Sequence, residues 1–394
     1  MKKQTQAIHL EYERRDAYDS LSVPVYNTLA YEFDNAAVMA EAFTDKIKAP
    51  DYSRVENPTV TNLERRVAAL TDAAHATAFN SGMAAISNTI MALAAQGKNI
   101  VTSKHLFGNT YALLVATLRR FGVKVRLRDL TNIEAVREAI DDDTCCVFLE
   151  ILTNPQLEVA DLKAISEVAH EKNVPLVVDS TVIPFTQFSA KSLGVDIEVV
   201  SSSKYVSGGA TSLGGLVIDY GTPYNGDFAK RLYGEMLFNF GAYMTPQVAY
   251  MQTIGLETLD ARYRVQSSNA LELAKKLRSL PQIKYVNYVG LEDNPYHELA
   301  QRQFGKTAGA MICIDLESKE ACFSFLNNLK LIHRATNLFD NRSLAIHPAS
   351  TIFGAFSENM RKSMDVKDTT IRLSIGLEDV DDLFEDIKQA VDSL

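Results

Sequence analysis

The sequence predicts an α/β fold with a mostly parallel central sheet, helices on both of its faces, and a smaller C-terminal α+β domain. From about residue 60 to residue 220, short apolar runs alternate with stretches of helical period. Strands that are separated by helices of this length imply right-handed βαβ crossovers and therefore parallel pairing. After about Pro246 long helical periods dominate. The 394 residues, 46% hydrophobic and 23% charged, have ordinary globular composition.

The individual elements follow from the same periodicities. Residues 1–50 are expected to be extended and mixed, with a helical stretch at Ala36–Phe43. In the central region, helices are expected at Thr61–Leu70, Met83–Ala95, Thr110–Phe121, Ile133–Ala139, Leu162–Lys172 and Phe188–Leu193, and strands at Ile100–Ser103, Val123–Arg128, Thr144–Ile151, Pro175–Ser180, Ile197–Ser202 and Gly215–Asp219. In the C-terminal region, helices are expected at Leu256–Ser279, Lys319–Leu329 and Val380–Leu394, and strands at Tyr285–Tyr288, Ala310–Asp315 and Ile371–Ser374. The expected division is an N-terminal segment (1–50), a central domain (51–250) and a C-terminal α+β domain (251–394).

Charge and cysteine content argue against several classes of protein. The formal net charge of −9 argues against nucleic-acid binding. No apolar run reaches membrane-spanning length, and no apolar segment follows the basic residues at the N-terminus, so a cytoplasmic protein is expected. The four cysteines form no C-x-x-C pair and are expected to be reduced packing thiols. No metal site is predicted.

Lys204 is the first candidate for chemistry. A predicted apolar strand ends in three serines and delivers Lys204, which a flexible pair, Gly208-Gly209, soon follows. A lysine at the carboxyl end of a strand, partly shielded from water, has a lowered pKa, and its free amine can condense with an aldehyde. Taken alone, Lys204 also fits a solvated surface lysine.

Two further predicted strands end in polar residues. Asp179 closes an apolar strand, where a carboxylate is costly to bury unless a positive group meets it. A protonated pyridinium nitrogen would meet it and act as an electron sink, although a helix N-cap or an ion pair with an arginine would also explain Asp179. Asn154 follows another strand and could hydrogen-bond a ring hydroxyl, or serve as a turn residue before Pro155.

Two segments are suited to a phosphate group. Ser81, Gly82 and Met83 open an amphipathic helix, where backbone N–H groups and a glycine that permits close approach form a phosphate seat. Ser-Gly at a helix start is otherwise a simple cap. Tyr52 and Arg54 lie two residues apart in a segment that is expected to be extended, so their side chains should share one side. Both side chains can donate hydrogen bonds to a phosphate.

Together these residues indicate a single cofactor. An aldehyde-reactive lysine, a carboxylate for a ring nitrogen, a partner for a ring hydroxyl and a phosphate seat fall at successive strand ends. No G-x-G-x-x-G follows the first strand, so the pattern does not fit a nicotinamide cofactor. The sequence therefore predicts pyridoxal phosphate on Lys204, with residues 51–250 as the cofactor-binding domain.

Over nearly its whole length the chain resembles the Cys/Met-metabolism family of fold type I pyridoxal phosphate enzymes. The motifs that carry the resemblance are Tyr52-Ser-Arg54-Val-Glu-Asn-Pro-Thr59, Ser81-Gly82-Met83, Asn154-Pro155, Asp179-Ser-Thr181, Ser201-Ser-Ser203-Lys204 and Thr370-Ile-Arg372-Leu-Ser374. The resemblance implies that Tyr52 and Arg54, with the N-terminal segment, reach a neighbouring subunit. A dimer is then the minimum active unit, and a tetramer is the family habit.

The resemblance also implies a role for each residue. Lys204, Tyr52 and Asp179 would be catalytic. Arg372 would clamp the substrate carboxylate, with Asn337 also contacting the substrate. The cofactor would be contacted by Lys204, Tyr52, Arg54, Ser81, Gly82, Met83, Phe107, Asn154, Asp179, Thr181, Ser201 and Ser203.

Two departures from the family pattern bear on the reaction. Phe107 stands where the family usually has a tyrosine that stacks on the cofactor and is often given an acid–base role. Phe107 can stack but cannot transfer a proton, so either Tyr52, Lys204 or Tyr111 takes over that task, or the reaction needs it less. Asn109 stands where methionine γ-lyases typically have a cysteine, which disfavours that activity.

The resemblance is greatest to O-acetylhomoserine sulfhydrylases. It implies γ-replacement on an O-acylated homoserine with sulfide or a small thiol as the sulfur donor, giving homocysteine or methionine. Cystathionine γ-synthase and the methionine or cystathionine γ-lyases of the same family are the nearest alternatives. A catalytically impaired cofactor-binding protein is the alternative that is not an enzyme, and an ordinary aminotransferase fits less well.

Overall fold

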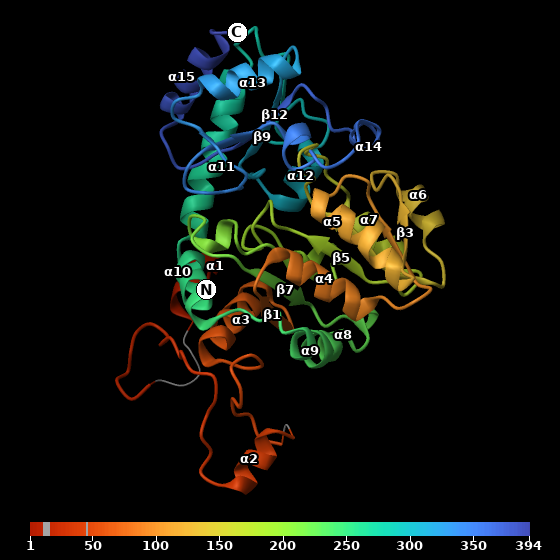
Figure 1. The fold of residues 1–394 in the computed structure, drawn as a ribbon, viewed down its shortest axis with the longest axis vertical. Helices are drawn as coiled ribbons and strands as arrows, with labels where there is room; N and C mark the ends of the chain where they lie inside the picture. The colour runs from red at the N-terminus through yellow and green to blue at the C-terminus, as the bar shows by residue number, and fades with distance from the viewer. Residues whose placement is uncertain (11–15, 45) are drawn as a thin grey trace.

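A computed structural model describes residues 1–10, 16–44 and 46–394, and it confirms the predicted fold class. The N-terminal segment that carries α2 (Ala36–Ala42) extends away from the rest of the chain, and the C-terminal part lies at the opposite end, beyond the central sheet (Figure 1). The expectation for residues 1–50 includes residues 11–15 and 45, which lie outside the described residues. Before them, α1 (Lys3–His9) packs against α3 (Pro58–Thr71) and α10 (Pro246–Glu257).

The central sheet has seven strands in the order β1-β7-β6-β5-β4-β2-β3. Neighbours from β3 to β6 pair in parallel, whereas β7 runs antiparallel to both β6 and β1. The strands are β1 (His75–Phe79), β2 (Asn99–Thr102), β3 (Lys124–Leu127), β4 (Thr144–Glu150), β5 (Leu176–Asp179), β6 (Ile197–Val200) and β7 (Gly215–Asp219). The sequence predicted all of them except β1.

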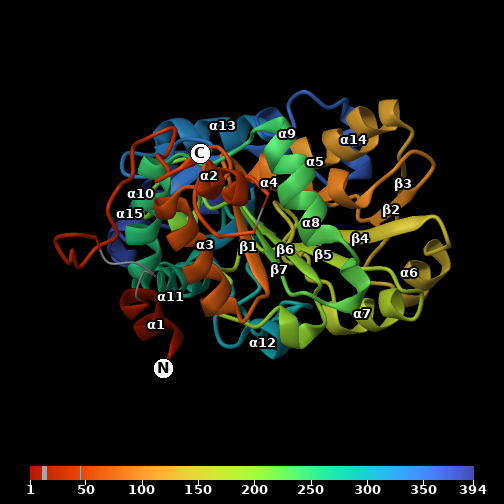
Figure 2. The same cartoon turned by 90° about the horizontal axis from the view of Figure 1, so that it is seen from below.

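Both faces of this sheet are buried, which explains why its strands read as continuous apolar runs. On β5, Leu176 and Val178 join one hydrophobic cluster, and Val177 between them joins the other. Figure 2 shows the strands between α4 (Gly82–Leu93) and α5 (Gly108–Ala112) on one side and α6 (Ile133–Ala139) and α7 (Leu162–His170) on the other. The remaining central helices are α8 (Phe228–Arg231) and α9 (Phe238–Phe240).

The C-terminal part contains a five-stranded sheet in the order β10-β11-β12-β9-β8. Its strands are β8 (Tyr285–Asn287), β9 (Met311–Asp315), β10 (His333–Arg334), β11 (Leu344–Ile346) and β12 (Thr370–Ser374). Its helices are α11 (Leu259–Leu277), α12 (His297–Phe304), α13 (Lys319–Asn328), α14 (Glu358–Ser363) and α15 (Val380–Val391). The pairs β12–β9, β8–β9 and β11–β12 are antiparallel, as an α+β unit requires.

Three helix predictions are wrong in detail. The single helix expected at Thr110–Phe121 is α5 followed by a π-helical turn (Leu113–Thr117) and a 3₁₀ turn (Leu118–Phe121). At Phe188–Leu193 only a 3₁₀ turn (Lys191–Leu193) forms, because Ser192 and Ser189 hydrogen-bond each other's backbone and compete with helical bonding.

The third corrected helix is Leu256–Ser279, which breaks at Thr258 into the end of α10 and all of α11. The side chain of Arg262 stabilises the break, because it donates to the carbonyl oxygens of Gly255 and Tyr205.

None of the helices in the described part of the chain combines the length and apolar character that crossing a membrane requires. The four cysteines are free thiols.

Candidate active site

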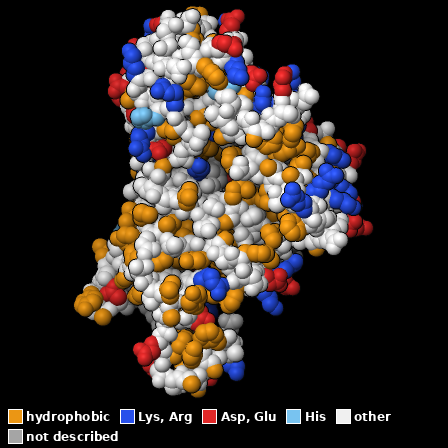
Figure 3. All heavy atoms as spheres, in the orientation of Figure 1, with side chains coloured by type: hydrophobic (Ala, Val, Ile, Leu, Met, Phe, Trp, Pro, Cys, Tyr) orange, Lys and Arg blue, Asp and Glu red, His pale blue; other side chains and the backbone are white. Residues whose placement is uncertain are grey.

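A cavity of about 340 Å³ lies at the carboxyl ends of β4, β5 and β6. We call it the strand-end cavity; the space-filling view is hollowed between the C-terminal part and the central sheet (Figure 3). The structure brings together most of the predicted site residues here: Ser81, Gly82, Met83, Phe107, Asn154, Asp179, Thr181, Ser201, Ser203, Lys204, Asn337 and Arg372.

Strand direction explains why residues so far apart in sequence meet here. The carboxyl ends of neighbouring parallel strands share one edge of a sheet, where α/β proteins bind their ligands. Asp179 ends β5, and Asn154 and Lys204 each follow four residues after the ends of β4 and β6. Because β1 is antiparallel to β7, and β7 to β6, β1 runs in the same direction as β6. Ser81, which follows β1, therefore reaches the same edge.

Lys204 lines this cavity together with Asn337 and Arg372. Its Nζ donates a hydrogen bond to Oδ1 of Asn337 over 2.7 Å. Burial, with a smaller contribution from the nearby charge of Arg372, lowers the pKa of Lys204 from 10.5 to about 8. At pH 7 about a tenth of this amine is therefore uncharged, and the uncharged form is the one that acts as a nucleophile or base.

Asp179 and Glu150 form a pair of buried carboxyl groups beside the lysine. They are register neighbours on β5 and β4, and both line the cavity. Burial raises the pKa of Asp179, against hydrogen bonds from Thr181, whose backbone N–H lies 2.9 Å from Oδ1. Burial and the charge of Asp179 raise the pKa of Glu150 to about 8. A cationic ligand group would favour the ionised form of this pair.

The start of α4 and the segment after β6 form the hydroxyl-rich end of the cavity. Ser81 caps α4, because its Oγ accepts a hydrogen bond from the backbone N–H of Ala84 over 3.1 Å. A Cβ at Gly82 would lie 2.6 Å from Cβ of Ser201, so only glycine allows this approach. The hydroxyl of Ser203 is bonded to the backbone of Gly214, and that of Thr181 accepts from the N–H of Ser201.

Arg372 enters the cavity from the smaller sheet. It lies on β12 and is only 3% exposed. Its guanidinium donates to Oδ1 of Asn154 over 3.2 Å and to the carbonyl oxygen of Asn337 over 3.1 Å. Its Nε is buried and has no hydrogen-bond partner among the described residues, so the site retains an unused donor. Burial lowers the pKa of Arg372 to about 10, which still leaves it cationic at neutral pH.

These groups fit pyridoxal phosphate. A helix start with hydroxyls around it suits a phosphate, a buried carboxylate suits a ring nitrogen, and an amine of lowered pKa suits an aldehyde. The cavity volume lies within the usual range for a small ligand. The residues of the described chain form no cluster of three or more His, Cys, Asp or Glu that could hold a metal ion.

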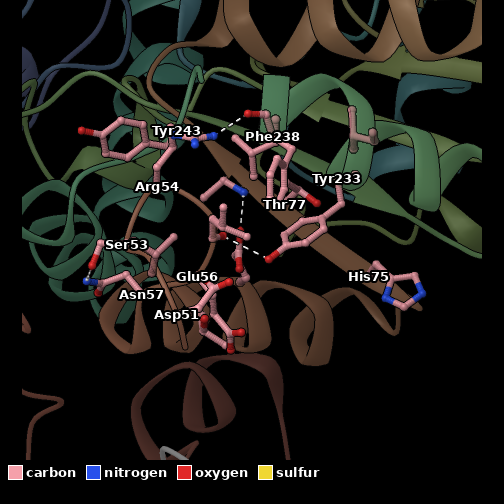
Figure 4. Close-up of a pocket in the computed structure, with 18 of the residues that line it drawn as sticks. Asp51, Ser53, Arg54, Glu56, Asn57, His75, Thr77, Tyr233, Phe238 and Tyr243 are labelled. Carbon is pink, nitrogen blue, oxygen red and sulfur yellow. Dashed lines mark hydrogen bonds between the residues drawn. The ribbon is translucent and has the colours of Figure 1, made fainter. Parts of the chain in front are cut away.

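Tyr52 and Arg54 do not reach the strand-end cavity of their own chain. Arg54 lines a second cavity of about 1030 Å³, where it donates to the carbonyl oxygen of Phe238 (Figure 4). The segment is a turn, since the N–H of Val55 bonds to the carbonyl of Tyr52, so the expected extended conformation is wrong. The two side chains are nevertheless together, with the guanidinium 5.5 Å from the centre of the Tyr52 ring.

Several lining residues were missed from the sequence. Glu150 is the second-last residue of the predicted strand Thr144–Ile151, and its charge in an apolar run was the available signal. Ile86 lies in the helix that was expected at Met83–Ala95. The others come from loops and turns that carry no periodic signal; they are Val182, Leu213, Thr336, Leu338 and Ile352. Asn109, which was singled out from the sequence, is exposed and does not line the cavity.

The chain is similar to known proteins over nearly its whole length. Residues 4–392 match the family described as Cys/Met metabolism PLP-dependent enzyme. The L-methionine gamma-lyase of Fusobacterium nucleatum subsp. polymorphum is 37% identical, with 99% of this chain and 98% of that protein covered. The O-acetyl-L-homoserine sulfhydrylase of Corynebacterium glutamicum is 32% identical, with 98% of this chain and 95% of that protein covered.

A solved structure adds the cofactor. The crystal structure of a Campylobacter jejuni protein described as an O-acetylhomoserine (thiol)-lyase superposes with a TM-score of 0.95, at 34% identity, and covers all of both chains. That protein carries N'-pyridoxyl-lysine-5'-monophosphate. The chain described here therefore belongs to the Cys/Met-metabolism family of pyridoxal phosphate-dependent enzymes, and pyridoxal phosphate is its cofactor.

Proposed function

We propose that this enzyme catalyses γ-replacement: sulfide or a small thiol takes the place of the acyloxy group on the γ-carbon of an O-acylated homoserine. The products are a carboxylate and homocysteine, or methionine when the donor is methanethiol. The observation that carries this proposal is that Phe107, whose side chain has no acidic group and cannot donate a proton, lines the strand-end cavity.

The identity of the leaving group explains why Phe107 matters. An acyloxy group leaves as a carboxylate, whose conjugate acid has a pKa of about 4, so it needs no proton. Elimination from methionine expels a thiolate, and thiols have pKa values of about 8.5 or above, so an acid that protonates the sulfur speeds that reaction. A phenylalanine at this place therefore supports an ester substrate.

The proposed roles follow from the chemistry of each side chain. Pyridoxal phosphate, when bound, supplies an aldehyde for amines and a ring that withdraws the electrons left at the α-carbon. Asp179 would hold the proton on the ring nitrogen, and Lys204, with its pKa near 8, would take and return protons at the α- and β-carbons. Ser81, Gly82, Ser201 and Ser203 would bind the phosphate, with Met83 and Thr181 beside the ring.

Substrate orientation would depend on the second sheet. Arg372 would bind the substrate carboxylate through the N–H donors of its planar guanidinium. Its Nε is available for this, because it has no partner among the described residues. Asn337 would release Lys204 and contact the substrate, while Asn154 would bind the ring hydroxyl and hold Arg372. Tyr52 and Arg54 of a neighbouring copy would complete the phosphate seat, which makes the homodimer the smallest active unit.

Product analysis tests the proposal. The purified holoprotein is given O-acetylhomoserine or O-succinylhomoserine with sulfide, and, separately, methionine or cystathionine alone. Homocysteine formed from an ester and sulfide is the expected result. A second candidate, elimination to a keto acid, is favoured by the 37% identity to the L-methionine gamma-lyase of Fusobacterium nucleatum. Release of 2-oxobutanoate from methionine at a rate above that of the ester reaction would establish that candidate instead.

A further inference from the structure

Glu150 is a buried carboxyl group in the strand-end cavity that the proposed reaction does not use. It ends β4, is 7% exposed and lines the cavity beside its register neighbour Asp179. Burying a carboxyl group is costly unless hydrogen bonds compensate for the lost water. A buried acid next to a second buried acid is more costly still. Its presence therefore calls for a structural or chemical reason.

The hydrogen bonds of Glu150 supply that reason. Its Oε1 accepts the backbone N–H of Phe107 over 2.5 Å, across 43 residues of sequence. The backbone of Asn154 also hydrogen-bonds this carboxyl group. One side chain thus connects Phe107, the residue before α5, with Asn154, four residues after the end of β4, and both of them line the cavity.

Phe107 needs such an anchor because it cannot anchor itself. A phenyl ring has no polar atom, so no hydrogen bond at its far end can fix its tilt. Phe107 is the N-cap residue of α5, and its side chain makes no capping bond. The position of the ring is therefore set by its backbone, whose N–H is held by Glu150 and whose carbonyl accepts the N–H of Tyr111 over 2.9 Å.

We propose that Glu150 is a positioning residue, which fixes the backbone at Phe107 and thereby sets how the Phe107 ring packs on the cofactor ring. This inference rests on the site assignment made above, but it is independent of whether the reaction is replacement or elimination. It identifies Glu150 as acting through a hydrogen-bond acceptor rather than through its charge. Glutamine has nearly the same shape and keeps an oxygen acceptor without the charge.

Two substitutions separate the acceptor from the charge. Glu150→Gln keeps the acceptor, and Glu150→Leu removes it while filling similar space. Glu198 on β6 is the control, since it is also buried but bonds to Ser180 and Tyr220 and does not line the cavity. Hydrogen exchange of peptide 105–112 is measured in the full-length holoprotein. The dissociation constant for pyridoxal phosphate and the circular dichroism of its visible band are measured after reconstitution.

The expected result is specific to the acceptor. E150L exposes the Phe107 amide to exchange, weakens pyridoxal phosphate binding about tenfold and reduces the visible circular dichroism, because a buried N–H is left unsatisfied. E150Q stays within about twofold of the wild type, since amide and carboxyl acceptors are alike in geometry. Glu198→Leu leaves peptide 105–112 unchanged. E150A repeats the test if E150L does not fold.

A double-mutant cycle tests whether Glu150 acts on the cofactor through Phe107. If Glu150 acts through Phe107, the effects of E150L and F107L on cofactor affinity are far from additive. The inference is overturned if E150L keeps wild-type protection and affinity, if E150Q is as damaged as E150L, or if the two substitutions add. An error in the site assignment would give a different result. In that case Lys204→Ala would retain the visible cofactor band, independently of the results for the Glu150 variants.

Discussion

The two cavities that hold the predicted site residues are built in different ways. The strand-end cavity is lined by strand ends, helix starts and one residue of the second sheet, and its polar groups bond to one another within the chain. The cavity beside Arg54 is about three times larger, 1030 Å³ against 340 Å³, and is lined by a turn, the start of α3 and the segment before α9. A single copy thus separates Tyr52 and Arg54 from the groups they are proposed to serve.

The largest expected effect belongs to the centre of the strand-end cavity. Lys204→Ala is expected to remove the visible band of lysine-bound cofactor and to lower turnover at least about 10³-fold, since it removes the proposed proton carrier. Absorption spectra before and after borohydride, with rates under saturating substrate, measure both. Lys191→Ala, at an exposed lysine paired with Asp72, is the control. A variant that keeps both band and turnover would remove Lys204 from the mechanism.

The next effect tests the contribution of the second sheet. Arg372→Leu is expected to raise KM and to lower kcat/KM about 100-fold, which corresponds to about 3 kcal/mol for a substrate carboxylate that loses its buried cationic partner. Cofactor affinity should change much less, because Arg372 is assigned to the substrate. Arg342→Lys, at an exposed arginine of the neighbouring loop, serves as the control. If R372L loses affinity for pyridoxal phosphate but keeps the wild-type KM, Arg372 serves the cofactor and not the substrate.

Local patterns predicted the strand-end cavity well, because Asp179, Asn154 and Lys204 each end or follow an apolar run, and parallel strands bring such ends together. They missed β1, whose His75-Ala-Thr-Ala-Phe79 is short and weakly apolar. They also missed the contact of Glu150 with Phe107, since it joins residues 43 positions apart. No spacing rule connects such positions.

The cavity beside Arg54 was predicted less well. The extended segment proved to be a turn, in which Asn57 bonds to Ser53 and caps α3. Short polar segments such as this one take their conformation from side-chain bonds to distant backbone, here from Asn57 to the carbonyl of Tyr26. Arg372 was placed at the site by family resemblance, because an arginine inside a strand has no local signature of substrate binding.

The third prediction tests whether the two cavities cooperate between copies. Arg54→Ala is expected to weaken pyridoxal phosphate binding about tenfold, as the loss of one charged phosphate contact does. Lys230→Ala, at a second cationic residue that lines the same cavity, should leave it unchanged. The measurement is a fluorescence titration of the protein from which the cofactor has been removed.

Mixing variants sharpens this third test. Subunits of R54A and K204A are dissociated, combined and assayed at limiting cofactor. If Arg54 serves a neighbouring site, each mixed dimer places both defects in one site and leaves the other intact, so about a quarter of the wild-type activity returns on random pairing. If Arg54 acts only within its own chain, mixed dimers have two defective sites and no activity returns.

The smallest expected effect lies at the junction between the cavity and the C-terminal part. His105, two residues before Phe107, contacts Glu158 through Nδ1 over 3.1 Å and Asp365 through Nε2 over 2.8 Å, and Lys104 also contacts Asp365. A neutral imidazole donates only one of these bonds, whereas the protonated ring donates both. Burial and Lys104 lower the pKa of His105, but the two carboxylates outweigh them and raise it above 6.5.

The sign of the pH dependence follows from that raised pKa. The contribution of His105 to stability is fully present below pH 6.5, the unfolded value, and is lost as the pH rises through the higher folded value. Because Asp365 is largely exposed, the contribution is at most about 1 kcal/mol. His105→Asn should therefore lower the melting temperature by about 1–2 °C at pH 6 and by less at pH 9. A difference that grows with pH would show that the neutral ring, and not the ion pair, joins the two parts.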